Sequence, residues 1–569
     1  MVLKFRRDKL SLNILYFFLA WMVITFLYLP NLNLFNVIFM RDGHLSLSAF
    51  GRLFSSTRAI QSLINSFILA ITAIITTNII GIFTVFVTEY FDIKGARILK
   101  LGYMTPLIYT GIVLVSGYKF VYGSTGIITK LLVNFFPNMN IEWFTGYVAV
   151  AFVFTFAKTS NHLIFLSDSL SKMDYQIIEA AQNMGASQLY IIRKIVLPIL
   201  KPTIFALTVL VFISGMGATS YSMIVGGDTF QTIGPMVLNF SSTASSRDLA
   251  ALLALILGIA TAILLLIMTH YERKNNYASV AKTHVEFVKQ KINNRALNIL
   301  VHIVAYILFI MYMLPIIFVV ILSFTDARTI GTGEITWSSF TLVNYIKVLT
   351  STSQLLPFIN SALYSIAAAI IVATIALIVS RLLHKYKNKF TGFLEYSLLI
   401  PWILPKTLIA IGLIITFDRG RLLIFNGVLS GTIWILLVGY IIVKMPFTLK
   451  MLKTAFYTMD DSLEEAAKSL GAGPIYTFVK VVLPIVIAPT LAVIALNFNS
   501  LLIDYDLTVF LYHPLKTPIG ILIQNSIDGG EATSDTRALL LVYSVIIMIV
   551  TTATLYFVYG RNRKGNKRK

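Results

Sequence analysis

The sequence lacks cysteine altogether and is poor in charged residues. Without cysteine, disulfides, thiolate metal sites, iron–sulfur clusters and thiol catalysis are all excluded. Asp, Glu, Lys and Arg make up 12% of the 569 residues, about half the share in soluble domains. The seven histidines have no metal-ligand spacing, and no Gly-x-x-x-x-Gly-Lys-Ser/Thr loop is present to cradle a nucleotide phosphate. We therefore expect no ATP hydrolysis, no bound cofactor and no metal site from this chain alone.

Apolar residues dominate instead. They make up 57% of the chain, with 40 Phe and 27 Tyr and a mean hydropathy of +0.81. Too little polar surface remains to coat a soluble globule of this size, so lipid is the natural solvent for the excess. The net charge of +21 comes from basic residues clustered between apolar runs, which is typical of membrane topology signals rather than nucleic-acid binding. The composition predicts an all-α polytopic membrane protein.

Twelve apolar stretches are long enough to cross about 30 Å of hydrocarbon. The first follows a basic amino terminus and resembles a signal peptide, but its length predicts a retained span. Of the 46 Lys and Arg, 33 fall on the side that holds both termini, 12 on the other side, and Lys406 within a span. Because cytoplasmic loops carry the excess of basic residues, both termini are expected in the cytoplasm. The expected spans are 11–30, 62–88, 99–118, 144–166, 203–224, 249–270, 298–323, 358–380, 395–417, 428–452, 485–510 and 537–559.

The chain contains an internal duplication. Residues 173–199 align without gaps on residues 459–485 at an offset of 286, with thirteen identities in 27 positions. Nearer the start, Ile64-Asn65-Ser66 matches Ile359-Asn360-Ser361 at an offset of 295. Each half has six spans of the same parity, so the halves are parallel repeats about an axis along the membrane normal. The expected units are a first half at 1–270, a cytoplasmic linker at 271–297 and a second half at 298–569.

The most similar part of the two halves is the inner loop between the fourth and fifth spans, at about 167–200 and about 453–485. Each copy reads as a short helix, a glycine break and a second helix that leads into the fifth span. Asp174 can cap the first helix, and in the second copy Asp461 and Glu464 have capping-box spacing. A loop repeated this closely indicates a shared cytoplasmic contact rather than two surface helices that merely join spans.

Both loops carry the pattern Glu-Ala-Ala, three residues, Gly, nine residues, Ile-x-Leu-Pro, with valine for isoleucine in the second copy. The glycine suits the left-handed residue that ends a helix, and the proline suits the start of a span. The pattern resembles the coupling motif of bacterial ABC importer permeases of the type I class, and the resemblance covers the whole chain. The matching residues are Glu179, Ala180, Ala181, Gly185, Ile195, Leu197 and Pro198, and then Glu465, Ala466, Ala467, Gly471, Val481, Leu483 and Pro484.

The resemblance implies a type I permease fold in a bacterial cytoplasmic membrane. Each loop's first helix would dock on a separate ATPase subunit, two copies in all, with Glu179 and Glu465 meeting basic residues and Gly185 and Gly471 making the turn. The partner would use the ATP, and an extracytoplasmic binding protein would deliver the solute. Closure of the ATPase dimer would rock the halves between inward-facing and outward-facing states. The chain itself would be a non-catalytic subunit.

The fused arrangement is most similar to ferric-iron permeases of the FbpB family, followed by thiamine permeases of the ThiP kind and phosphonate permeases. The stretches Asp248–Leu253 and Leu507–Tyr512 are similar to the iron branch. Ferric iron is therefore the first substrate hypothesis, with thiamine, phosphonate and polyamine as alternatives. The third spans depart from that branch's Pro-x-x-x-Pro-Gly turn, reading Pro106 to Thr110-Gly111 and Pro401 to Pro405-Lys406.

Two other classes of protein compete with this interpretation. An ion-coupled secondary transporter also has two six-span halves, but it predicts acidic or histidine relays within the spans. A membrane-embedded enzyme needs a metal or nucleophile constellation that the sequence does not offer. Both are distant alternatives.

Three charged residues are candidates for a translocation pathway: Lys406, Asp504 and Asp506. A lysine inside a span costs about 2.5–3.5 kcal/mol on insertion scales, so Lys406 is expected to face a cavity or a partner. Pro401 and Pro405 predict a broken helix beside it, while snorkelling to an interface is the alternative.

The two aspartates have an alternative interpretation. Carboxylates suit a hard cation such as Fe³⁺, but two that are separated by one residue do not share a helix face. That spacing favours an outer-surface or docking role for them. Lys158 and Lys444 are equivalent positions, expected at the inner ends of the fourth spans as positive-inside anchors.

Overall fold

The computed structural model describes residues 2–41, 43–109, 111–274, 288–528 and 533–557. Within these ranges the chain is helical apart from its loops and one hairpin, in which β1 (Met40–Arg41) pairs antiparallel with β2 (His44–Leu45). Of the expected linker, residues 275–287 lie outside the described residues. The helices up to the linker are α1 (Val2–Val23), α2 (Leu29–Phe39), α3 (Ser48–Ser55), α4 (Thr57–Val85), α5 (Ala96–Tyr103), α6 (Gly111–Tyr122), α7 (Ile127–Phe135), α8 (Gly146–Ser171), α9 (Tyr175–Asn183), α10 (Gln188–Ile191), α11 (Leu197–Met216), α12 (Thr219–Val225), α13 (Ile233–Ser241) and α14 (Arg247–Lys274).

The helices after the linker repeat this order. They are α15 (Arg295–Ser323), α16 (Ala327–Thr332), α17 (Val343–Thr350), α18 (Thr352–Lys385), α19 (Lys389–Leu399), α20 (Lys406–Phe417), α21 (Ile433–Tyr457), α22 (Ser462–Ser469), α23 (Pro474–Thr477), α24 (Leu483–Leu502), α25 (Thr508–Leu511), α26 (Ile519–Asp528) and α27 (Ser534–Leu555).

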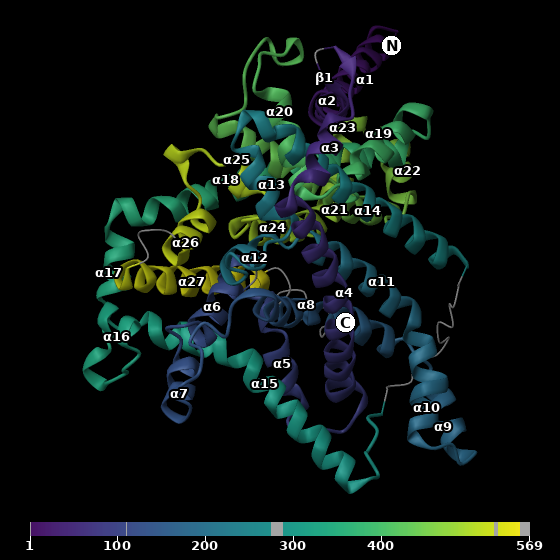
Figure 1. The fold of residues 1–569 in the computed structure, drawn as a ribbon. Helices are drawn as coiled ribbons and strands as arrows, with labels where there is room; N and C mark the ends of the chain where they lie inside the picture. Colours follow the sequence, from purple (N-terminus) through teal and green to yellow (C-terminus); the bar gives the residue numbers. More distant parts are fainter. Residues whose placement is uncertain (1, 42, 110, 275–287, 529–532, 558–569) are drawn as a thin grey trace.

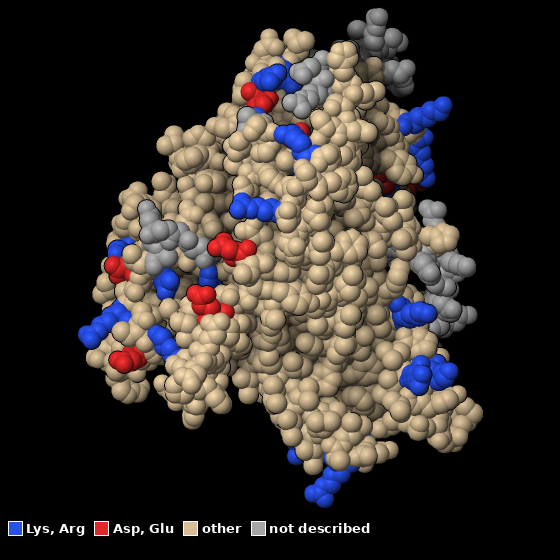
Figure 2. Space-filling view, in the orientation of Figure 1, with Lys and Arg blue, Asp and Glu red and all other residues tan. Residues whose placement is uncertain are grey.

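The long helices match the apolar stretches of the sequence. In the described ranges, eleven are long and apolar enough to cross a membrane, and a bent pair makes twelve if it is counted as one span. Each overlaps one of the twelve expected stretches. Figure 2 shows a broad face almost free of charge, with basic and acidic side chains gathered toward its margins. The expected all-α polytopic architecture is confirmed.

The third span of each half, expected at 99–118 and 395–417, is broken in the structure. In the first half, α5 and α6 are separated by a turn of 3-10 helix at Thr105–Leu107. In the second half, the helix that ends at Trp402 bends by 108° into α20. Proline causes these breaks, because it lacks the N–H that a helix needs and clashes with the preceding turn. The broken helix expected beside Lys406 is therefore confirmed.

The fifth spans are shorter at their outer ends than the expected 203–224 and 485–510. Each begins after a π-helical turn, Ile192–Val196 or Phe478–Val482, just before the proline of the loop motif. α11 ends at Met216 and α24 at Leu502. Residues 503–507 are consequently a non-helical turn before α25. The two candidate aspartates lie in this turn, so the argument from helix faces does not apply to them.

The first helix of each half packs into the core of the other half. α15 runs along α5 and α6, and its Ala305, Tyr312 and Val319 are buried in the core of the first half. α1 and α2 contact α19 and α20, and Leu19 and Val23 are buried in the second-half core. Figure 1 shows this exchange, with α15 beneath the purple and blue helices of the first half and α1 and α2 among the green helices of the second. Burying these apolar helices across the halves joins the two repeats into one body.

Candidate functional site

The repeated loops present two short helices of the same build at the right of Figure 1. We call residues 172–196 and 458–482 the coupling loops. In the first loop, the Asp174 side chain accepts a hydrogen bond from the Gln176 N–H at 3.0 Å and caps α9, as expected. In the second loop the expected capping box is absent: Asp461 makes no side-chain cap to α22, and Glu464 is bonded elsewhere. The Glu464 carboxylate, which a capping box would require, instead forms an ion pair with Arg381.

A left-handed glycine ends both helices. Gly185 has φ +81° and Gly471 has φ +83°, and no atom lies within 4 Å of where a Cβ would be. The prediction of a left-handed helix end is confirmed at both positions. The obstacle to any other residue here is backbone strain rather than space, because L side chains clash with their own carbonyl in this conformation.

The motif residues divide between an exposed and a buried face of each helix. Glu179 and Ala180 are exposed, while Ala181 packs against the core. Glu465 and Ala466 are likewise exposed, and Ala467 is half-buried. Beside them, two equivalent apolar side chains stand in solvent, Met184 at 82% and Leu470 at 88% exposure. Each loop thus offers a carboxylate and a bare apolar residue, a combination suited to a partner protein.

The two loops are held by different interactions. In the first, Gln290 from the linker is buried and its side chain bonds both Gln182 and Tyr175, at 2.5 and 3.1 Å. The Gln290 backbone also bonds across to Tyr90 and Asp92. The linker therefore clamps α9 to the end of α4.

The second loop is held by an ion pair in place of the linker. The Nη1 and Nη2 atoms of Arg381, near the end of α18, donate to the two carboxylate oxygens of Glu464, with Nη2–Oε2 at 2.7 Å. These hydrogen bonds hold the pKa of Glu464 below its ordinary value, against the opposing effect of burial. Beside this ion pair, the Nε2 atom of His384 lies 3.3 Å from the Oδ1 atom of Asp461. In the first loop the position equivalent to Glu464 is Ile178, which is fully buried.

The clamp on the first loop can be tested separately. Replacing Gln290 by alanine removes its two side-chain hydrogen bonds to the first loop, worth about 1 kcal/mol each, so amide hydrogen exchange in α9 should quicken at least about fivefold. Exchange in α22 should not change. Gln176→Ala, an exposed position on α9 itself, is the control. Equal exchange in Gln290→Ala and wild type would contradict the clamp.

A polar cavity of about 270 Å³ lies between the two halves. Lys406, at the start of α20, pairs with Asp504, whose other oxygen accepts from the Leu507 N–H at 3.1 Å. Asp506 accepts from the Ser220 N–H of the first half at 3.2 Å. Lys406 and both aspartates line one cavity, together with Pro106, Leu107, Gly111, Leu114, Ala157, Lys158, Ser160, Asn161, Ser220, Tyr221, Ser500, Ile503 and Tyr505.

Two interpretations made from the sequence are wrong at this cavity. Lys406 does not snorkel to an interface, because its ammonium group pairs with Asp504 inside the protein. Asp504 is not an outer-surface residue, because its side chain is only 5% exposed. Asp506 lines the same cavity. The structure thus brings together the three candidate residues, which are up to 100 positions apart in the chain.

Lys158 and Lys444 are also placed differently from the expectation. Each lies near the middle of its helix, α8 or α21, rather than at an inner end. Lys158 lines the cavity, and Lys444 donates to the cavity residue Ser500 at 2.5 Å. The one signal in the sequence for this placement is the equivalence of the two lysines in the duplication.

The cavity lies where equivalent segments of the two halves meet. Ser220 and Asp506 are 286 residues apart, which is the repeat offset, and they contact each other. Gly111 is the counterpart of Lys406 at the offset of 295, and both line the cavity. Tyr505 also donates to the Met223 sulfur of the other half at 3.2 Å. The cavity is therefore on the pseudo-twofold axis.

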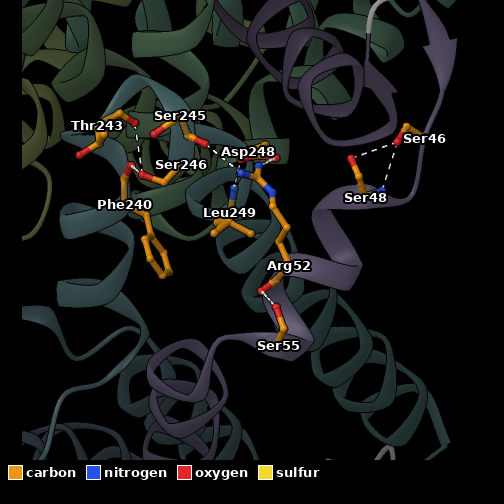
Figure 3. Close-up of polar contacts among 10 residues, drawn as sticks. All are labelled: Ser46, Ser48, Arg52, Ser55, Phe240, Thr243, Ser245, Ser246, Asp248 and Leu249. Carbon is orange, nitrogen blue, oxygen red and sulfur yellow. Dashed lines mark hydrogen bonds and ion pairs between the residues drawn. The ribbon is translucent and has the colours of Figure 1, made fainter.

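A second polar chamber, of about 570 Å³, lies near α3, at the opposite end of α4 from the first coupling loop. Arg52 reaches from α3 to the Asp248 carboxylate and to the Ser245 carbonyl, as Figure 3 shows. Arg247 bonds Asp418 of the second half at 3.0 Å. Sequence reasoning missed this chamber, because its ion pairs join residues of distant segments. In the sequence, Asp248 is distinguished only as part of the stretch Asp248–Leu253 that is similar to the iron branch.

No cluster of three or more His, Asp or Glu side chains in the described part of the chain could hold a metal ion.

Comparison with known proteins identifies relatives of both halves. The family profile described as binding-protein-dependent transport system inner membrane component matches residues 95–276 and 379–564. The probable ABC transporter permease protein y4fN of Sinorhizobium fredii is 37% identical over 539 residues, 94% of each chain. The ferric transport system permease protein FbpB of Actinobacillus pleuropneumoniae is 21% identical over 85% of this chain and 68% of its own length. The putative 2-aminoethylphosphonate permease protein PhnV of Salmonella typhi is 25% identical over 252 residues, 44% of this chain and 90% of its own.

Proposed function

Because the chain belongs to the family of binding-protein-dependent transport system inner membrane components, with one family domain in each half, we propose that it imports a solute at the expense of ATP hydrolysed by separate subunits. The chain is a multi-pass membrane permease of the type I importer fold, as the sequence predicted. Family membership favours this function over an ion-coupled secondary transporter and a membrane-embedded enzyme. The proposed location is the bacterial cytoplasmic membrane, with both termini inside.

One observation carries the proposal: two coupling loops of the same build stand exposed at equivalent positions. Each presents a glutamate and a bare apolar side chain, Glu179 with Met184 and Glu465 with Leu470. Two copies of one ATPase subunit would each take one loop. A pair of equal sites on one chain suits two copies of the same partner. ATP is bound by that partner, and this chain needs no cofactor of its own.

The solute is proposed to arrive from an external binding protein and to cross by way of the central cavity. Lys406, Asp504 and Asp506 would line the route, since the cavity lies between the two halves that would rock against each other. With both termini inside, the second polar chamber, around Arg52 and Arg247, would lie on the side from which the solute enters.

More than one class of substrate has support, because the relatives include permeases named for ferric iron, 2-aminoethylphosphonate, and spermidine and putrescine. Similarity to a ferric transport permease supports ferric iron, the first hypothesis from the sequence. Similarity to a 2-aminoethylphosphonate permease supports a phosphonate, and the lysines around the cavity favour an anion. Iron remains compatible with those lysines if it crosses together with oxyanion ligands of its own.

Reversing the charge of both coupling glutamates tests the proposal. In cells that lack the native gene, the Glu179→Lys/Glu465→Lys variant should insert normally, yet restore uptake at least about tenfold less well than wild type, since like charges across an interface repel. Uptake of radiolabelled ferric citrate, 2-aminoethylphosphonate and thiamine would be followed. Glu142→Lys, a reversal at an exposed residue preceding α8, should transport normally. Wild-type uptake by the double variant would overturn the docking assignment.

A further inference from the structure

Four charged side chains line the central cavity and a fifth, Lys444, contacts its lining residue Ser500; their charges do not balance. Lys158, Lys406 and Lys444 supply three positive charges, and Asp504 and Asp506 supply two negative charges. The first half contributes only Lys158, which is the counterpart of Lys444. The counterparts of Lys406, Asp504 and Asp506 are uncharged: Gly111, Ala218 and Ser220. Lys158 and Lys444 are thus a pair shared by both halves, whereas Lys406, Asp504 and Asp506 come from the second half alone.

Only one pair in this set is neutralised directly. Lys406 and Asp504 form an ion pair. Lys158 makes no ion pair in the described ranges; its ammonium lies 5.5 Å from the centre of the Phe154 ring and interacts electrostatically with Asp506 and Lys406. Lys444 donates to the hydroxyl of Ser500 and likewise has no ion pair in the described ranges. Lys158 and Lys444 therefore retain positive charge and hydrogen-bond donors that a bound solute could use.

The positions of Lys158 and Lys444 exclude a role as anchors at the inner ends of their spans. An ammonium group that anchors a span lies at the end of its helix, where it can reach the headgroups. Lys158 and Lys444 instead occupy the middle of α8 and α21; Lys158 lines the cavity, and Lys444 contacts its lining residue Ser500. Ionisable groups at membrane depth are expensive and usually mark the route of a substrate.

We infer that Lys158 and Lys444 form a paired binding site for the acidic oxygens of a small oxyanion, bearing a phosphonate, phosphate or carboxylate group, as it crosses between the halves. Three ammonium groups against two carboxylates favour a solute with net negative charge and disfavour a bare trivalent metal ion or a polyamine. The ligand oxygens are those of a free oxyanion or those of an oxyanion bound to ferric iron. This inference rests on the proposed import function and names its class of solute.

Binding to the purified full-length chain in lipid nanodiscs tests the inference without any ATPase. The probes are 2-aminoethylphosphonate, inorganic phosphate, citrate, ferric citrate and spermidine, and the readout is the dissociation constant from the shift in unfolding temperature. At least one oxyanion should stabilise the wild type, whereas spermidine should not. If ferric citrate binds and citrate alone does not, the ligand is the oxyanion bound to iron. If a metal-free oxyanion binds, the ligand is the free oxyanion.

Three variants separate a binding role from a structural one. Lys158→Gln/Lys444→Gln should weaken oxyanion binding at least about tenfold, while Lys158→Arg/Lys444→Arg, which retains both charges, should stay near wild type. Asp506→Asn should tighten oxyanion binding, because it removes a repelling charge and leaves an oxygen that can still accept from Ser220. Lys347→Gln, at an exposed lysine of α17, is the control for loss of charge.

Two results would overturn the inference. One is a wild-type chain that no oxyanion stabilises. The other is a chain that spermidine stabilises and that loses this effect in Asp506→Asn. Either result would leave the import function standing if the coupling-glutamate variants still fail to transport. Conversely, normal transport by those variants would refute ATPase docking without affecting the binding measurement.

Discussion

Replacing Lys406 by alanine should lower the free energy of unfolding by about 3 kcal/mol. The substitution leaves Asp504, only 5% exposed, as a buried carboxylate without its cation, and removal of one partner of a buried pair is far more damaging than the pair itself is stabilising. The Leu507 N–H, 3.1 Å from the carboxylate, compensates only in part. Unfolding of the purified chain in detergent, followed by denaturant titration or calorimetry, measures the effect.

Two comparisons make the Lys406 result specific. Lys406→Met/Asp504→Asn removes both charges and should recover most of the lost stability. Lys172→Ala breaks the Lys172–Asp168 pair, in which both side chains are 60% exposed, and should cost less than about 1 kcal/mol. If Lys406→Ala were no more harmful than Lys172→Ala, the buried pair would not hold the second half in the way described. Transport by Lys406→Ala should also be reduced, because the pair lines the proposed route.

Replacing Arg381 by alanine should destabilise the second coupling loop by about 3 kcal/mol. Arg381 and Glu464 are 16% and 9% exposed and are joined by two hydrogen bonds, so the variant leaves Glu464 buried and unpaired. Hydrogen exchange should rise strongly in α22 and hardly in α9, which depends on Gln290 instead. Arg381→Leu/Glu464→Ile imitates the first loop, where Ile178 is buried, and should restore much of the stability. Failure of both variants to change exchange in α22 would contradict this role.

The same pair predicts a response to acid. The pKa of Glu464 is lower in the folded protein, because Arg381 bonds the carboxylate, than the value of about 4.3 expected in the unfolded chain. The unfolded state therefore takes up the proton first. The stabilisation is fully present above about pH 4.3 and is lost as pH falls through the folded-state pKa. Protection of α22 should accordingly decline in acid in the wild type, and Arg381→Ala should already lack it at neutral pH.

Much of the fold could be predicted from the sequence because its determinants are local. Each span is a continuous apolar run, which needs no knowledge of its neighbours to be identified. The coupling loops also depend on local chemistry, as the cap at Asp174 and the left-handed conformations of Gly185 and Gly471 confirm. Prediction failed where a local feature competed with a distant partner: Glu464 had the spacing of a capping box but pairs with Arg381, 83 residues earlier.

The sequence by itself determined that this is a duplicated, helical membrane protein with two coupling loops, because hydrophobic length, periodicity and repetition are written along the chain. Only the tertiary structure decided that α1, α2 and α15 cross into the opposite half, and that Lys406 meets Asp504, 98 residues away. It also placed Lys158 in the central cavity and Lys444 against the lining residue Ser500, rather than at the expected inner ends of their spans. These features depend on how long helices pack about the pseudo-twofold axis. A charge inside a span must find its partner or cavity in three dimensions, and its neighbours in sequence do not specify which one.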